Sequence, residues 1–256
     1  MREERPISSL PDGIEISTLD ERPDLEARAR SLDAAFPEFI HHDAVVTRHW
    51  ERLYTDFAPF QIVVCERGEV VAAGNSVSVY WDGTTKGLPE GLDAALERSM
   101  GDAEEYRDPN VVSAILAVVS RENGGRGLSR VVLQGMKAAA AESGLGALIA
   151  PVRPTLKHLY PLTPMDRYAR WERPDGLPFD PWLRVHRRLG AEILCVAPRS
   201  MLITGKISEW EDWTGLRFPE SRPYVVPGAL SPVSMDVEAD SGTYEEPNVW
   251  TRHAVG

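Results

Sequence analysis

Apolar positions along the chain follow two patterns, continuous or alternating runs and runs with helical spacing. Continuous or alternating runs predict strands at residues 14–20, 61–66, 69–81, 111–119 and 145–152. Helical spacing predicts amphipathic helices at residues 23–36, 44–57, 88–107, 128–143 and 181–189. Strands that alternate with helices in this way predict an α/β protein with a central sheet.

The most informative pattern lies between residues 111 and 143. A buried strand ends at Val119, a polar turn at residues 121–127 contains three glycines, and a helix begins close to Leu128. Glycine allows positive φ and leaves neighbouring amide hydrogens uncovered. Since a helix N-terminus also carries partial positive charge, the stretch predicts an anion-binding cradle.

Two common phosphate-binding motifs do not fit this turn. A dinucleotide fingerprint needs glycine at the position of Arg130 and an acidic residue in a strand about 20 residues later, and both are missing. The phosphate loop of nucleotide triphosphatases needs Gly-Lys-Ser/Thr, which is also missing. The anion is therefore expected to belong to another class of ligand.

The turn resembles the acyl-coenzyme A binding motif of the GCN5-related N-acetyltransferase (GNAT) superfamily, Gln/Arg-x-x-Gly-x-Gly/Ala. Residues 122–127 align with it, with Gly125 and Gly127 at its glycine positions and Glu122 in place of Gln or Arg. Arg121 and Arg126 could supply the positive charge. The resemblance implies an α/β (α+β) fold with a mixed central sheet of about six to seven strands, flanking helices and inserted segments.

The resemblance also implies where coenzyme A binds. The strands at residues 111–119 and 145–152 are expected to splay apart and admit the pantetheine arm. Amides near the end of the first strand would face the thioester, and amides of the glycine turn would hold the pyrophosphate. The implied cofactor-binding residues are Ala117, Val118, Val119, Asn123, Gly124, Gly125, Arg126, Gly127, Leu128 and Ser129. Acetyl-CoA or another acyl-CoA is the implied cosubstrate, and no metal is expected.

Catalytic groups are marked less clearly. Many members of the superfamily use a tyrosine after the fifth strand to protonate the departing thiolate, and Tyr160 and Tyr168 compete for this role. The strand at residues 111–119 contains no carboxylate that could act as the general base. The remaining candidates for the base are Glu38, Asp43 and Asp82.

The implied function is acyl-CoA-dependent N-acyl transfer, with acetyl-CoA as the expected donor, to the amine of a small molecule that attacks the thioester directly. Because the base is poorly marked, a non-catalytic acyl-CoA-binding protein of the same fold is the alternative. An NAD- or ATP-binding domain is a more distant one.

Charge and composition limit the kinds of partner that the protein is expected to bind. A net charge of −11 disfavours non-specific binding to nucleic acid. No apolar run reaches the roughly 18 residues that a membrane helix needs, and the first residues lack the apolar core of a signal peptide, so we expect a cytoplasmic protein without a membrane partner. Cys65 and Cys195 lie in apolar runs and are expected to be reduced thiols. An exposed late strand would suit a homodimer.

A single elaborated domain is expected over residues 1–256, with a core at about 14–204 and a C-terminal extension at about 205–256. A Pro- and Arg-rich insertion before residue 181 is expected to shape the acceptor site. Within the extension, residues 224–236 predict a seventh strand, and the acidic tail predicts irregular structure. The sequence His41-His42-Asp43 lacks the i, i+4 spacing of a metal site and predicts a solvated turn.

Overall fold

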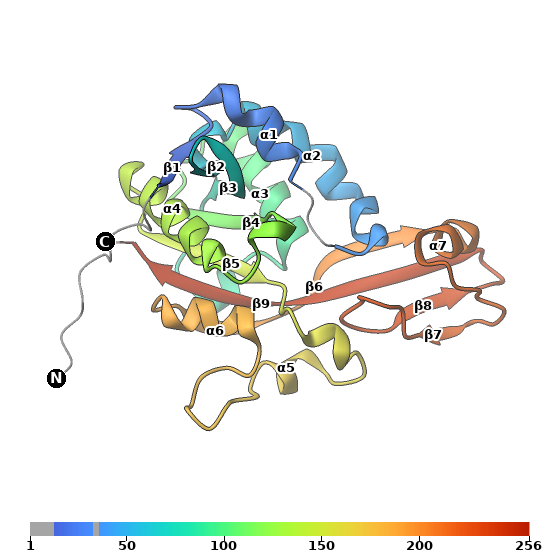
Figure 1. Cartoon of the computed structure of the whole chain (residues 1–256). Helices are drawn as coiled ribbons and strands as arrows, with labels where there is room; N and C mark the ends of the chain where they lie inside the picture. The colour runs from blue at the N-terminus through green and yellow to red at the C-terminus, as the bar shows by residue number, and fades with distance from the viewer. Residues whose placement is uncertain (1–12, 33–35, 256) are drawn as a thin grey trace.

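A computed structural model describes residues 13–32 and 36–255 (Figure 1). Its strands are β1 (Ile14–Thr18), β2 (Ile62–Glu66), β3 (Glu69–Val79), β4 (Val111–Val119), β5 (Ala147–Val152), β6 (Glu192–Gly205), β7 (Arg222–Tyr224), β8 (Val233–Asp236) and β9 (Ser241–Ala254). Its α-helices are α1 (Glu26–Arg30), α2 (Ala44–Thr55), α3 (Leu92–Glu104), α4 (Leu128–Glu142), α5 (Met165–Tyr168), α6 (Pro181–Arg188) and α7 (Ile207–Thr214).

The strands form one nine-stranded mixed sheet. Its order is β1-β2-β3-β4-β5-β9-β8-β7, and β6 pairs with β9 beside this path. The pair β4–β5 is parallel, joined through α4 as a βαβ unit, whereas the neighbouring pairs are antiparallel. The predicted mixed sheet with flanking helices is confirmed, although it contains more strands than expected.

Helices cover the two faces of the first five strands. On one face α4 packs on alternate residues of these strands, and on the other α1, α2 and α3 enclose a second apolar cluster. Gly74 in β3 lies under α4, where an added Cβ would come within 2.4 Å of Val132 Cγ1. Glycine at this position therefore allows α4 to pack closely on β3.

The C-terminal segment differs most from its prediction. The tail, expected to be irregular, forms β9, which pairs with β5 and then β8 along one edge and with β6 along the other (Figure 1). The expectation was wrong because several polar side chains of this strand are buried in hydrogen-bonded positions, Glu246, Asn248, Thr251 and His253 among them. Polar composition therefore concealed a central strand. The predicted seventh strand is divided into β7 and β8 by an intervening turn.

The His41-His42-Asp43 turn is less solvated than predicted. Asp43 is completely buried and caps α2, because its Oδ1 accepts a hydrogen bond of 2.8 Å from the backbone N–H of Val46. The His42 ring stacks on Trp213 of α7 with its centroid 4.2 Å away. The turn therefore connects the first helices to the C-terminal part of the chain.

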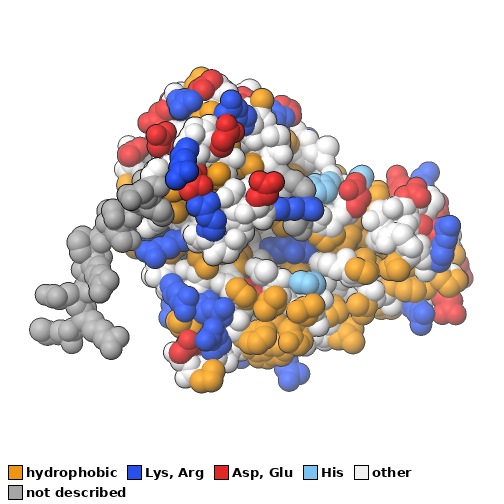
Figure 2. All heavy atoms as spheres, in the orientation of Figure 1, with side chains coloured by type: hydrophobic (Ala, Val, Ile, Leu, Met, Phe, Trp, Pro, Cys, Tyr) orange, Lys and Arg blue, Asp and Glu red, His pale blue; other side chains and the backbone are white. Residues whose placement is uncertain are grey.

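The surface is mixed in character. Acidic and basic side chains alternate over the upper part of the face in Figure 2, and apolar side chains gather lower down. Leu159 and Leu162, which precede α5, are among the exposed large apolar residues. Within the described residues, no helix combines the length and the apolar character needed to cross a bilayer.

Candidate active site

The site begins where β4 and β5 separate. Their register includes only the pairs Val112↔Leu148 and Ser113↔Ile149. Beyond these pairs lies a cleft of about 1410 Å³, whose walls include residues 114–119 of β4 and residues 150–152 of β5. The splayed strand pair implied by the resemblance is therefore present.

A β-bulge lies on the β4 wall of this cleft. Asn75 of β3 pairs with Leu116, whereas the next residue, Ser76, pairs with Ala114, so that Ile115 is the extra residue. A bulge residue is left out of the regular ladder, and its backbone groups become available to a ligand. Ile115 lines the cleft, which makes this the point where β4 can offer a polar backbone group to a bound molecule.

The glycine turn has the geometry of an anion cradle. Gly125 and Gly127 have φ of 77° and 79°, in the left-handed region that favours glycine. Gly127 is the N-cap of α4 and offers no side chain as a cap. The first amide hydrogens of a helix have no partner inside the helix, and a Cβ built on either glycine would find no atom within 4 Å. Open space therefore adjoins amides that are ready to donate.

The predicted cofactor-binding residues fall into three groups. Ala117, Val118, Val119 and Ser129 line the cleft. Asn123, Gly124, Gly125, Arg126 and Gly127 form the turn beside it, where Arg126 pairs with Glu66 at 2.6 Å. The third group is Leu128 alone, whose side chain packs from the first turn of α4 into the apolar core. Their contacts with coenzyme A stay predictions, and the structure brings nine of the ten to the cleft wall or the adjoining turn.

The two predicted catalytic tyrosines lie together in an aromatic cluster with Trp171 and Phe179. The Tyr168 hydroxyl donates a 2.9 Å hydrogen bond to Asp180, the residue that caps α6. Burial, reinforced by the Asp180 carboxylate, raises the pKa of Tyr168 above its usual value. Neither Tyr160 nor Tyr168 is among the residues that line the cleft, and a catalytic role for either stays a prediction.

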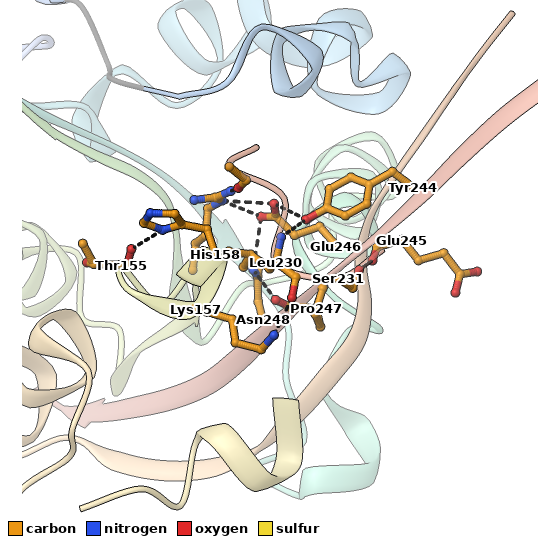
Figure 3. A network of polar contacts seen from close by, with 12 residues as sticks. Thr155, Lys157, His158, Leu230, Ser231, Tyr244, Glu245, Glu246, Pro247 and Asn248 are labelled. Carbon is orange, nitrogen blue, oxygen red and sulfur yellow. Dashed lines mark hydrogen bonds and ion pairs between the residues drawn. The ribbon is translucent and has the colours of Figure 1, made fainter. Parts of the chain in front are cut away.

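His158, which sequence reasoning did not select, lines the cleft just after β5. Its Nδ1 lies 2.9 Å from the backbone carbonyl oxygen of Thr155 (Figure 3). A carbonyl oxygen only accepts, so Nδ1 carries the hydrogen and Nε2 keeps a lone pair. No hydrogen bond within the described residues uses Nε2. His158 therefore presents a proton acceptor near the position where the superfamily places its tyrosine.

Arg153 and Glu246 form a second polar feature of the cleft that the sequence did not reveal. Arg153 directly follows β5, and its Nε lies 3.0 Å from both carboxylate oxygens of Glu246. Glu246 is completely buried and also accepts hydrogen bonds from Tyr244 and Asn248 (Figure 3). Both partners of the ion pair line the cleft, which places a fixed arginine next to the splayed strands.

The remaining buried polar groups are a pair of histidines and a pair of aspartates. His186 of α6 lines the cleft beside its partner His253, 2.9 Å away, and burial lowers the pKa of His186 to about 3, so that it is neutral. Asp43 and Asp93 form a buried pair at the start of α2 and α3; burial raises the pKa of both, that of Asp93 to about 8.

The general bases suggested from the sequence, Glu38, Asp43 and Asp82, are not among the cleft-lining residues.

No group of three potential metal ligands comes together within residues 13–32 and 36–255.

Similar folds occur among solved structures. The chain superimposes on the loading GNATL domain of CurA from Lyngbya majuscula with a TM-score of 0.56 and 15% identity, over 94% of this chain and 98% of that one. The GphF GNAT-like decarboxylase in complex with isobutyryl-CoA gives a TM-score of 0.51 and 16% identity, over 95% and 99%. Together with the splayed strands and the glycine turn, these similarities define a GNAT fold.

No protein-family model matches the sequence. The chain is, however, 34% identical to the arginine N-acetyltransferase avaD of Aspergillus versicolor over a gapped alignment 284 positions long, which covers 96% of each protein. The chain therefore belongs to the GNAT superfamily. As a member of this superfamily it is an N-acyltransferase that takes an acyl-CoA as cosubstrate and acts on an amine, which favours the enzyme over the non-catalytic alternative.

Proposed function

We propose that the protein transfers the acetyl group of acetyl-CoA to the amine of arginine or a similar small cationic molecule. The observation that carries this proposal is the near full-length similarity to an arginine N-acetyltransferase. The net charge of −11 agrees with a cationic acceptor.

The geometry of the cleft supports a position for the cosubstrate. The pyrophosphate lies on the amides of Gly125, Arg126, Gly127, Leu128 and Ser129, where α4 adds its positive end. The pantetheine follows Ala117, Val118 and Val119 along β4 to the bulge. The bulge at Ile115, which lines the cleft, is our proposed source of a backbone N–H that stabilises the oxyanion formed when the amine attacks the thioester.

Proton transfer is assigned to His158. The neutral amine nitrogen forms a bond to the thioester carbon, and the nitrogen then loses one proton to Nε2 of His158, directly or through a water molecule. The carbon–sulfur bond breaks as the tetrahedral intermediate collapses, and the protonated His158 gives that proton to the departing sulfur, which leaves as coenzyme A thiol. Tyr160 stays the predicted alternative donor of that proton.

The test is amine-dependent release of free thiol from acetyl-CoA, with the acetylated product weighed by mass spectrometry. We expect His158→Gln to lower kcat by about 10²- to 10⁴-fold with little change in acetyl-CoA affinity. His49→Gln is the matched control, because His49 lies on α2 outside the cleft lining. Release of no thiol with arginine or any of a broad panel of amines would contradict the proposed function.

A cytoplasmic location and a homodimeric assembly stay predictions from the sequence. We include both in the proposal. Size-exclusion chromatography with light scattering tests the dimer, and fluorescence microscopy of a tagged chain tests the location.

A further inference from the structure

We propose that Arg153 binds the carboxylate of the acceptor, so that the enzyme selects α-amino acids over amines that lack a carboxylate. This inference rests on the proposed function, because it names the substrate class of the same cleft. It rests on three features of the structure, namely how Arg153 is held, what part of its guanidinium is unused, and where it lies relative to His158.

Within the described residues, hydrogen bonds hold the guanidinium of Arg153 along one edge, through Nε and Nη2. Its Nε donates to both oxygens of Glu246 at 3.0 Å, and its Nη2 donates to the backbone oxygen of Gly228 at 2.8 Å. Glu246 is itself fixed by the Tyr244 hydroxyl at 3.1 Å and by the Asn248 amide at 3.3 Å. The carboxylate thus has partners on both oxygens, and the orientation of the guanidinium is set in advance.

Within the described part of the chain, the opposite edge of the guanidinium has no hydrogen-bond partner. Among the hydrogen bonds within the described residues, none uses Nη1 of Arg153, and one hydrogen of Nη2 also stays available. The side chain is 20% exposed and lines the cleft, while Glu246 is 0% exposed. The Nη1–Nη2 edge of an arginine matches the two oxygens of a carboxylate, which it binds through two parallel hydrogen bonds.

A stabilising role does not explain this arrangement well. Burial of an ion pair costs much of the energy that its attraction returns, so an apolar pair of similar size would hold these strands at least as firmly. A pair that is kept in a ligand-binding cleft, with one edge open, instead suits a binding function. Glu246 then acts as a positioning residue that fixes Arg153, and Arg153 contacts the ligand.

The position relative to the reaction supports an α-amino acid. The amine and carboxylate of such a molecule are bonded to the same carbon, so their binding groups must lie close together. Arg153 and His158 belong to one short segment after β5, and both line the cleft. Figure 3 shows His158 and Glu246 in the same region, with Glu246 near the centre of the polar network and His158 to its left in this view. One wall therefore offers both a carboxylate site and a proton acceptor for the amine.

Pairs of acceptors that differ only by the carboxylate test the inference. Arginine is compared with agmatine, lysine with cadaverine, and phenylalanine with phenethylamine, in the same thiol-release assay. A charge-assisted pair of hydrogen bonds predicts that kcat/KM is about 10- to 100-fold higher for the amino acid of each accepted pair. Equal or better use of the decarboxylated compound overturns the inference while leaving N-acetylation intact.

Variants show whether Arg153 causes the preference for acceptors that carry a carboxylate. Arg153→Gln should reduce the ratio between amino acid and amine to nearly 1. Because this change leaves Glu246 buried without its cation, the double variant Arg153→Gln with Glu246→Gln provides a second, neutral version with the same expected result. Acetyl-CoA affinity, measured by calorimetry, reports that both are folded.

The matched control is Arg199→Gln, because Arg199 pairs with Glu90 at 3.1 Å away from the cleft lining. It should keep the wild-type preference. If the preference for the amino acid survives in both Arg153 variants, Arg153 is not the carboxylate site. If none of the compounds is acetylated by the wild-type enzyme, the proposed function fails first, which distinguishes the two failures.

Discussion

Substitution of Gly127 tests the anion cradle. The glycine has φ of 79°, and a residue with a Cβ at such a position costs about 1 to 2 kcal/mol of folding stability. In a chain of this size, 1 kcal/mol lowers Tm by roughly 2 to 4 °C. A Cβ would also extend into the open space beside the first amides of α4, where the phosphate is expected to lie. Each charge-assisted hydrogen bond lost there weakens binding by about 1.5 to 3 kcal/mol.

Gly144 provides the matched control at the opposite end of the same helix. It has φ of 73°, and a Cβ there would also find no atom within 4 Å. Gly127→Ala and Gly144→Ala should therefore lose similar stability in thermal unfolding. Only Gly127→Ala should lose affinity for coenzyme A, by about 10- to 150-fold in isothermal titration calorimetry. Equal affinities of the two variants would refute the assignment of the cradle.

Two further predictions concern buried ionisable groups. The folded protein keeps a proton on Asp93 up to about pH 8 that the unfolded chain releases near 3.8, so stability should fall as pH rises through this interval. Thermal unfolding across that range measures the slope, and Asp93→Asn should reduce it; an unaltered slope would contradict the assignment. Tyr168→Phe removes the hydrogen bond to Asp180 and should lower the free energy of unfolding in urea by about 1.5 to 3 kcal/mol without changing acetyl-CoA affinity. A large fall in kcat at unchanged stability would instead support catalysis by Tyr168.

Local patterns in the sequence predicted the centre of the fold. The strand that ends at Val119, the glycine turn and the helix that begins at Leu128 are all present, because apolar spacing and glycine conformation act within a few residues. The strand at residues 145–152 was also predicted from its apolar run, and its separation from β4 was implied by the family resemblance. These are the elements on which the proposed coenzyme A site depends.

Structure that depends on distant partners was not predicted. Nothing local shows that β9 pairs with both β5 and β6, since its polar residues become buried only when they meet partners such as Arg153. His158 and Arg153 were overlooked for the same reason. A lone histidine and a lone arginine after a strand carry no spacing signal, and their roles depend on Thr155 and Glu246. The sole local sign was that Arg153 directly follows a predicted cleft strand and that His158 lies six residues beyond its end.

A crystal structure of the protein grown with coenzyme A tests the central claim most directly. The account predicts pyrophosphate oxygens about 3 Å from the amide nitrogens of Gly125 to Ser129, and pantetheine between β4 and β5. Coenzyme A bound at another surface, with the splayed strands closed on each other or filled by side chains, would contradict it.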